Sequence, residues 1–153
     1  MVLCEAAAYY KQQGKTLWDA MIEIYDEFGY YADGVESITL KGKEGIEKIG
    51  SIMETIRENP LTQVGDYPVV TFRDYKTDKM LDVASGKVTP TGLPSSNVLY
   101  FDLPDGAWIC LRPSGTEPKL KYYFGIKGDS LADADVKLNG LKEEVEKILR
   151  PML

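Results

Sequence analysis

The chain has 153 residues, of which 44% are apolar, and this suits one ordinary domain, or one domain with part of another, around a hydrophobic core. Its formal net charge of −6 excludes a broad basic face for nucleic acid or for an anionic membrane, so any anion site must be local. It contains no histidine, which excludes Ser-His-Asp, Cys-His and HExxH chemistry.

The N-terminal part of the sequence predicts two helices joined by a tight turn. Apolar residues recur at helical spacing over residues 2–13, and Gly14 is placed to end this helix. Thr16 can cap a second helix with Asp19 three residues further on. The apolar side of that helix continues to Phe28.

The segment GYYADG, residues 29–34, contains two glycines and predicts a linker between the helical pair and the rest of the chain. Residues 35–40 predict a strand, with alternate side chains on opposite faces. Residues 43–59 predict an amphipathic helix that Pro60 stops. Its core face is a set of apolar residues spaced by three or four positions: Ile46, Ile49, Met53 and Ile56.

Short strand-like runs alternate with turns between residues 61 and 126. The runs cover residues 69–75, 79–83, 98–101, 107–111 and 119–126. Leu103-Pro-Asp-Gly106 predicts the tight turn of a hairpin. Residues 85–96 are rich in Gly, Pro, Ser and Thr, and predict a surface excursion that could face a partner domain.

A long final helix is predicted over residues 131–148, with Ser130 and Asp133 as a capping pair and with Glu143 and Lys147 paired on its outside. Three aspartates near its start suggest a metal site, although the helix dipole favours acids there in any case: Asp129, Asp133 and Asp135. The order strand, helix, several strands, helix predicts an α+β fold, in which two helices cover one face of a mainly antiparallel sheet.

The sequence favours a cytoplasmic protein. No stretch is apolar for long enough to span a bilayer, and Glu5 interrupts the N-terminus where a signal peptide needs an apolar run. Cys4 and Cys110 lie far apart and lack metal-ligand spacing. We therefore expect both cysteines to be reduced and buried.

The loop RPSGTEPK, residues 112–119, lies between two predicted strands and predicts a clamp for a dianion such as phosphate. Arg112 supplies a planar fork of donors. Gly115 lacks the Cβ that keeps a phosphate away from the backbone, so successive N–H groups can form a concave nest. Hydroxyl donors and further cations come from the rest of the loop and the next strand: Ser114, Thr116, Lys119 and Lys121. The alternative is a polar turn, since turns need the same residue types.

RPSGTEPKLK followed by a strand resembles the phosphate-binding loop in the last domain of the α-D-phosphohexomutases, the phosphoglucomutase and phosphomannomutase superfamily. Residues 3–31 resemble the closing helices of the third domain of a phosphoglucomutase, and residues 35–60 resemble the opening of the fourth. The resemblance implies that residues 1–31 are third-domain helices with a hinge. It also implies that residues 32–153 are a C-terminal domain of TATA-binding-protein-like α+β fold.

In that superfamily the last domain closes over a phosphosugar and grips its phosphate. The resemblance assigns this role to Arg112, Ser114, Gly115 and Thr116, with Lys119 beside them. It implies an isomerase of glucose 1-phosphate and glucose 6-phosphate that uses Mg²⁺ and glucose 1,6-bisphosphate. The phosphoserine and the metal-binding aspartate loop of that enzyme belong to other domains, and neither motif occurs here. The chain is therefore expected to be a non-catalytic fragment that itself holds no cofactor.

Two other classes of function stay open at this stage. The chain could be a freestanding phosphosugar-binding or regulatory module, which would bind a sugar phosphate without other domains. It could also be a protein-interaction domain whose RPSGT loop is only a turn, which would bind none even in a longer chain. The sequence does not decide which sugar is used, because in the superfamily that choice depends largely on a third-domain motif that would precede Met1.

Overall fold

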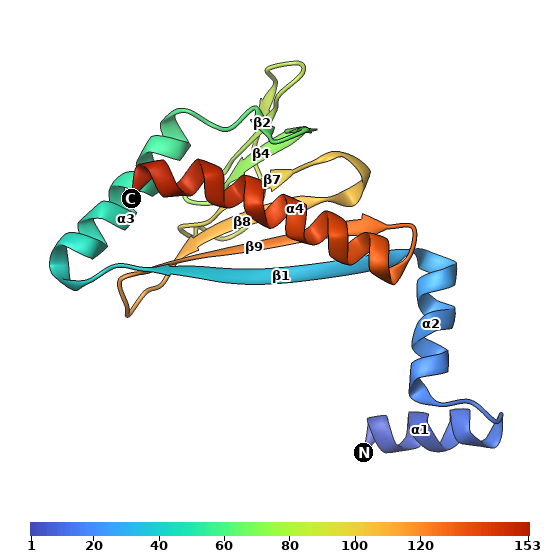
Figure 1. The fold of residues 1–153 in the computed structure, drawn as a ribbon. Coiled ribbons are helices and arrows are strands. Elements are labelled where there is room, and N and C mark those ends of the chain that lie inside the picture. The colour runs from blue at the N-terminus through green and yellow to red at the C-terminus, as the bar shows by residue number, and fades with distance from the viewer.

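A seven-stranded sheet, antiparallel at every pairing, is the centre of the structure, a computed structural model that describes residues 1–153 (Figure 1). The spatial order of the strands is β1-β9-β8-β7-β4-β5-β6. In that order their bounds are Tyr30–Thr39, Lys119–Gly128, Trp108–Pro113, Leu99–Asp102, Thr71–Asp74, Lys79–Asp82 and Val88–Thr89.

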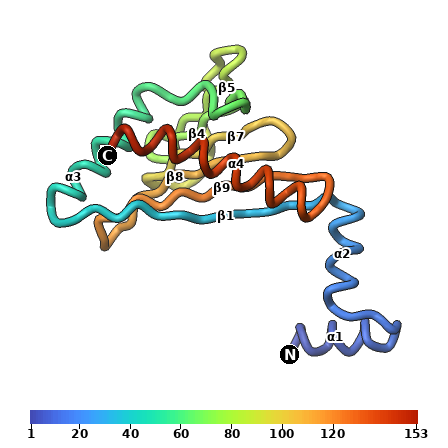
Figure 2. Tube along the Cα trace, viewed as in Figure 1, coloured from blue at the N-terminus to red at the C-terminus, as the bar shows by residue number.

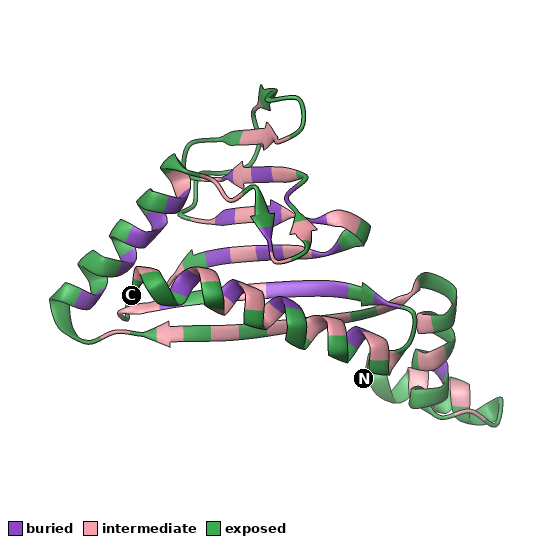
Figure 3. Cartoon of the chain, turned by 45° about the horizontal axis from the view of Figure 1, so that its top comes forward, coloured by how far each residue is buried: buried purple, intermediate pink, exposed green.

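Two helices, α3 (Gly42–Glu58) and α4 (Leu131–Leu149), cover one face of this sheet, which confirms the predicted α+β class (Figure 2). The core lies between the helices and the sheet, where Figure 3 shows the buried residues. On β9 the core face alternates as predicted: Leu120, Tyr122, Phe124 and Ile126. Each such large apolar side chain contributes about 1.5–3 kcal/mol to stability by leaving water.

The predicted core face of α3 is wrong at one position. Ile46 is 58% exposed, whereas Ile52, which was not predicted, is buried. The buried residues of the helix are Gly45, Ile49, Ile52, Met53 and Ile56. Gly45 fixes the first turn, because a Cβ there would lie 2.7 Å from the Cβ of Leu40. Gly45 therefore packs against Leu40, and the next residue, Ile46, lies outside the buried face of the helix.

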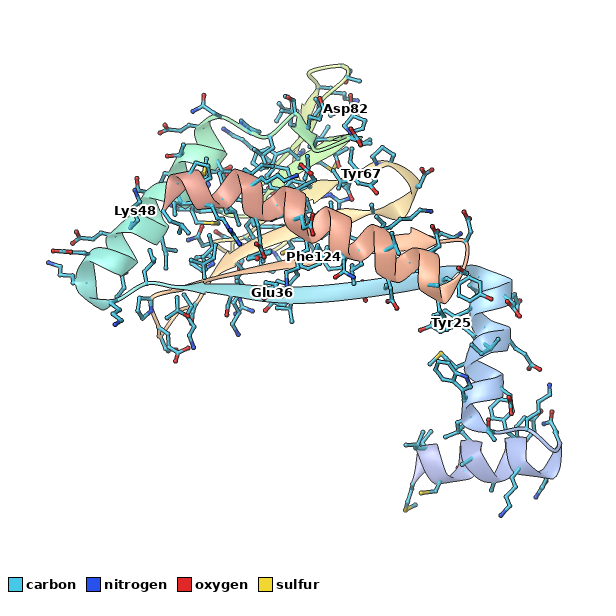
Figure 4. The ribbon with its side chains drawn as sticks, viewed as in Figure 1. Tyr25, Glu36, Lys48, Tyr67, Asp82 and Phe124 are labelled. Carbon is cyan, nitrogen blue, oxygen red and sulfur yellow. The ribbon has the colours of Figure 1, made fainter.

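The predicted linker at residues 29–34 is wrong, because β1 begins at Tyr30 and pairs with β9 over all of its ten residues. Its glycines serve close packing. A Cβ at Gly34 would lie 2.5 Å from the ring of Phe124, which is labelled in Figure 4. Gly29 has a φ of 110° and lies against Lys127. The division into residues 1–31 and 32–153 stays a prediction, and its boundary falls inside β1.

The two N-terminal helices, α1 (Val2–Gln12) and α2 (Leu17–Phe28), follow their predicted signals. Gly14 takes a φ of 73°, and the N–H of Lys15 closes α1 by bonding the carbonyl of Tyr10 at 2.9 Å. Thr16 and Asp19 form a reciprocal capping box, whose hydrogen bonds lower the pKa of Asp19. The pair extends away from the sheet (Figure 1) and buries only Ala20.

Several smaller features differ from the sequence prediction. Cys4 is exposed on α1, so its predicted burial is wrong, while Cys110 on β8 is half-buried, and burial raises the pKa of its thiol. The surface excursion at residues 85–96 includes the edge strand β6. A second small sheet, formed by β2 (Gln63–Val64) and β3 (Tyr67–Pro68), was not predicted.

The connections around the sheet complete the fold. The predicted turn between β7 and β8 is a short 3₁₀ helix, η1 (Pro104–Gly106). Ser130 caps α4 as predicted, since the N–H of Asp133 bonds its hydroxyl at 3.1 Å. Lys147 pairs with Glu144 at 2.6 Å, not with the predicted Glu143. The chain ends in a second 3₁₀ helix, η2 (Arg150–Met152). None of the helices combines the length and the apolar content that crossing a bilayer requires.

We expect the amides of residues 2–28 to exchange with solvent faster than those of α4 around Val145. The reason is that α1 buries no residue and α2 buries only Ala20, so opening these helices exposes little apolar surface. Hydrogen exchange followed by mass spectrometry measures the difference, and the amides of β1 that donate to β9 are expected to be as protected as those of α4. Equal protection of residues 3–28 and of α4 would show that the helical pair is firmly docked.

Candidate anion-binding site

The loop predicted to bind an anion joins β8 to β9 at one end of the sheet (Figure 1). The N–H of Ser114 donates to the carbonyl of Lys119 at 2.8 Å and closes the loop at its base. The N–H of Leu40, directly after β1, donates to the carbonyl of Pro118 at 2.9 Å. The loop is therefore held by three neighbouring strands, while Gly115 and Thr116 at its tip are exposed.

Backbone donors gather at this tip. The N–H groups of Gly115, Thr116 and Glu117 make no hydrogen bond within the chain, and neither do the hydroxyls of Ser114 and Thr116. No residue of the loop has a positive φ, so the expected nest does not involve a left-handed glycine. A Cβ at Gly115 would meet no atom within 4 Å, so the glycine leaves open space beside these donors.

Arg112 supplies a cation that is free of partners within the chain. It lies across from Lys121 on the sheet face that the helices do not cover, and it is exposed. The charge of Arg112 opposes the burial that raises the pKa of Cys110, two residues earlier on the same face. Lys119 differs, because its ammonium pairs with Glu117 at 3.0 Å. Arg112 and Lys121 are thus the two cations of the predicted set that have no ion-pair partner within the chain.

A cavity of about 320 Å³ lies between the loop and α3. Residues of α3, Asn97 before β7 and the loop itself form its walls: Ile46, Ile49, Gly50, Asn97, Pro113, Ser114, Gly115, Glu117, Pro118 and Lys119. Of the predicted site residues, Ser114, Gly115 and Lys119 therefore share one cavity. Arg112 and Thr116 do not line it, since one lies on the uncovered face and the other at the exposed tip.

A buried ion pair stands behind this cavity, and the sequence analysis missed it. Asp74, 2% exposed, accepts a hydrogen bond from Nε of Arg57 at 3.0 Å and a further one from the hydroxyl of Thr77. Nη2 of Arg57 donates to Oδ1 of Asn97 at 2.7 Å. Nη1 lies 2.8 Å from Oε1 of Glu54, off the direction of a hydrogen bond. The carboxylate of Asp74 is thereby satisfied without water.

Glu54, the exposed acid of this network, contacts two cations. Glu54 accepts from Nζ of Lys76 at 2.7 Å in addition to its contact with Arg57. These interactions, the hydrogen bond from Lys76 first, lower the pKa of Glu54. The network joins residues 17 and 40 positions apart, so no spacing in the sequence signals it. The local patterns within it are the Asp74 to Thr77 turn and the contact between Glu54 and Arg57, three residues apart on α3.

A second hollow of about 340 Å³ lies near the other end of β9 and contains two lysines. Lys137 pairs there with Asp133 at 2.6 Å, which raises its pKa, and Nζ of Lys127 lies 5.4 Å from the ring centre of Tyr31. Of the three aspartates suggested as a metal site, Asp129 lines this hollow, and Asp129 and Asp133 both approach Lys137. Both lysines therefore already have partners within the chain.

The family model and the similar proteins that match this chain point to the same family. Residues 71–148, just over half of the chain, match the family described as phosphoglucomutase/phosphomannomutase, C-terminal domain. A phosphoglucomutase of Staphylococcus aureus (strain bovine RF122 / ET3-1) is 36% identical over 140 residues, which cover 92% of this chain and 25% of that protein. A phosphoglucomutase of Staphylococcus haemolyticus (strain JCSC1435) is 38% identical over 120 residues, covering 78% and 22%.

A solved structure was also similar. It is the open form of the exocytosis-sensitive phosphoprotein pp63/parafusin, a phosphoglucomutase from Paramecium, and it matches 92% of this chain and 25% of its own length. The identity is 15% and the TM-score 0.47, which is too low to support a conclusion. The chain spans about a quarter of the length of the curated relatives it matches.

We expect Asp74→Ala to destabilise the chain by about 3–5 kcal/mol, because it leaves the guanidinium of Arg57 buried without its carboxylate. Urea unfolding followed by circular dichroism measures the loss. The matched control is Glu47→Ala, which removes an exposed ion pair with Lys43 on the same helix as Arg57, and should change stability by less than about 0.5 kcal/mol. Equal effects of the two substitutions would contradict a structural role for the buried pair.

Proposed function

Because the chain belongs to the phosphoglucomutase/phosphomannomutase family, as a C-terminal domain, we propose that its loop at residues 112–119 binds the phosphate group of a phosphosugar such as glucose 1-phosphate or glucose 6-phosphate. The observation that carries the proposal is the exposed and unpaired guanidinium of Arg112 in the same loop as three backbone N–H groups that have no partner within the chain. Phosphate needs this combination, because a planar cationic fork and several N–H donors can share its oxygens.

The remaining donors of the loop would bind the phosphate together with Arg112. The hydroxyls of Ser114 and Thr116 and the N–H of Gly115 complete the phosphate cradle around Arg112. Lys119 contributes when it leaves Glu117, an exchange that a dianion favours because it attracts the ammonium more strongly than one carboxylate does. Arg112 and the cavity residues lie on opposite sides of the loop, so binding requires the loop to wrap around the anion.

The chain is proposed to act as the phosphate anchor of a longer mutase, with the remaining domains supplying the chemistry. Phosphoryl transfer depends on a positioned nucleophile and on charge stabilisation at the transferring group, while this loop would hold the phosphate that does not react. No three of its Asp, Glu or Cys side chains are grouped to hold a metal ion. The Mg²⁺ and glucose 1,6-bisphosphate of such an enzyme would be bound elsewhere.

We expect the 153-residue chain to bind glucose 6-phosphate weakly, with a Kd of about 1 mM, because water competes for the phosphate at an open site. Arg112→Ala should weaken binding about tenfold, and Arg112→Lys should recover only part of the loss, since lysine keeps the charge but not the fork. Shifts of the loop amides in an NMR titration report the affinity. The matched control is Arg150→Ala, which removes one exposed arginine that lies outside the loop and pairs with Glu146.

Unchanged binding in Arg112→Ala would contradict the proposal and favour an ordinary turn. In a full-length mutase carrying this domain, the same substitution should reduce kcat/KM by more than it weakens binding here, because the anchored phosphate orients the sugar for transfer at its far end. An effect on kcat/KM within about twofold would likewise exclude the clamp. Glucose, which lacks the phosphate, should leave the loop amides unshifted.

We expect the purified chain to show no mutase activity toward glucose 1-phosphate, with or without Mg²⁺ and glucose 1,6-bisphosphate. The reason is that it would supply only one of the groups that transfer requires. A coupled assay for glucose 6-phosphate measures turnover, with a full-length phosphoglucomutase added to the same buffer as the positive control. Turnover that persists through repeated purification would overturn the anchor role.

A further inference from the structure

Asn97 lies in the wall of the cavity beside the loop and uses only one end of its amide within the chain. Its Oδ1 accepts from Nη2 of Arg57 at 2.7 Å. An arginine side chain can donate but cannot accept, so the amide oxygen must face Arg57 and the Nδ2 group must face the other way. Nδ2 makes no hydrogen bond within the chain, and it carries two N–H donors.

The position of Asn97 is fixed by a group that cannot easily move. The side chain of Arg57 is only 9% exposed, and that of Asp74, which binds its Nε, is 3% exposed. Glu54 lies beside its remaining nitrogen. An asparagine on the surface is therefore held by a buried ion pair that links it to α3 and β4. Such support reduces the ordering that a ligand would otherwise have to impose on the amide.

The part of the cavity wall that α3 forms leaves space. Gly50 lies in the interior of α3, where glycine is disfavoured relative to alanine, and a Cβ there would meet no atom within 4 Å. No packing within the chain therefore requires a glycine at this position. Because Gly50 also lines the cavity, its missing side chain keeps room between α3 and the loop. The cavity thus has space for a bound group, with unused donors from Asn97 on one side and from the loop on the other.

We propose that Asn97 is an additional ligand-binding residue of this site, and that it donates from Nδ2 to an oxygen of a phosphate monoester held by the loop. Arg57 and Asp74 act as positioning residues, since they orient Asn97 without touching the ligand. The inference rests on the proposed function of the loop. The proposal adds a hydrogen-bond donor from outside the loop. Arg57 holds this donor in place, so its position does not depend on the conformation of the loop.

The test is an NMR titration of the 153-residue chain with glucose 6-phosphate, using the side-chain NH₂ pair of Asn97 and the backbone amides of residues 114–117 as separate reporters. In the unchanged chain both sets should shift with the same Kd. Asn97→Asp keeps an acceptor for Arg57 but replaces the donors by a negative charge, and should weaken binding about tenfold. Asn97→Ala should weaken it about threefold.

The matched control is Asn139→Asp on α4, which makes the same change in charge away from the cavity and should leave the Kd within about twofold. Thermal unfolding of each variant reports whether the fold is retained. If the loop amides shift and Asn97→Asp and Asn97→Ala bind as tightly as the unchanged chain, the role of Asn97 is wrong while the function of the loop stands. If no loop amide shifts at all, the proposed function fails, and the role of Asn97 with it.

Discussion

β9 is paired on both sides, with β8 on one and with β1 on the other, and the candidate site depends on this double pairing. The pairing with β1 runs over ten residues and is possible because Gly34 makes room for the ring of Phe124. It also carries the end of β1 to the loop, where the N–H of Leu40 binds Pro118. α4 then closes over the same two strands, with Lys142 paired to Glu36, which is labelled in Figure 4.

The site combines a firm wall with an exposed loop. Arg57 and Asp74 are joined by a hydrogen bond that is largely withdrawn from water, and Arg57 in turn binds the exposed side chain of Asn97. Gly115 and Thr116 at the loop tip are exposed, and the N–H donors of residues 115–117 have no partner within the chain. A phosphate that joins the two would gain charge-assisted hydrogen bonds from both. Asn97 would orient the phosphate, and the loop would supply most of the positive charge that binds it.

The sequence predicted those parts of the fold that depend on local patterns. The capping box at Thr16, the helix-ending Gly14 and the alternation on β9 were all confirmed, because each needs only near neighbours. Gly34 was misread as a sign of flexibility, since the ring that requires it lies 90 residues further along the chain. Ile46 was misplaced because spacing alone does not decide which of the apolar positions on α3 face the sheet, and the packed helix buries Ile52 and leaves Ile46 exposed.

For the candidate site too, the sequence predicted the residues that are neighbours along the chain and missed those brought together by the fold. The RPSGT residues stand together in the sequence, so their shared loop could be recognised, but the separation of Arg112 from the cavity depends on which strand face each residue occupies. Asn97 and Asp74 give no sequence signal of their own, because their partner Arg57 comes from another element. The sequence therefore showed which loop residues can donate hydrogen bonds to a phosphate, but it did not show which residues of other elements lie beside the loop.

β1 lies at the border of the sheet, so one side of this ten-residue strand carries backbone N–H and C=O groups without a partner strand. Such a border can template the addition of a strand from another molecule. If two copies of β1 paired antiparallel over their full length, Asp33 of each would lie opposite Glu36 of the other. Glu36 already pairs with Lys142 of its own chain, so a second carboxylate beside it would compete for that ammonium. The acids at the centre of β1 therefore disfavour full-length pairing of this edge with a second copy.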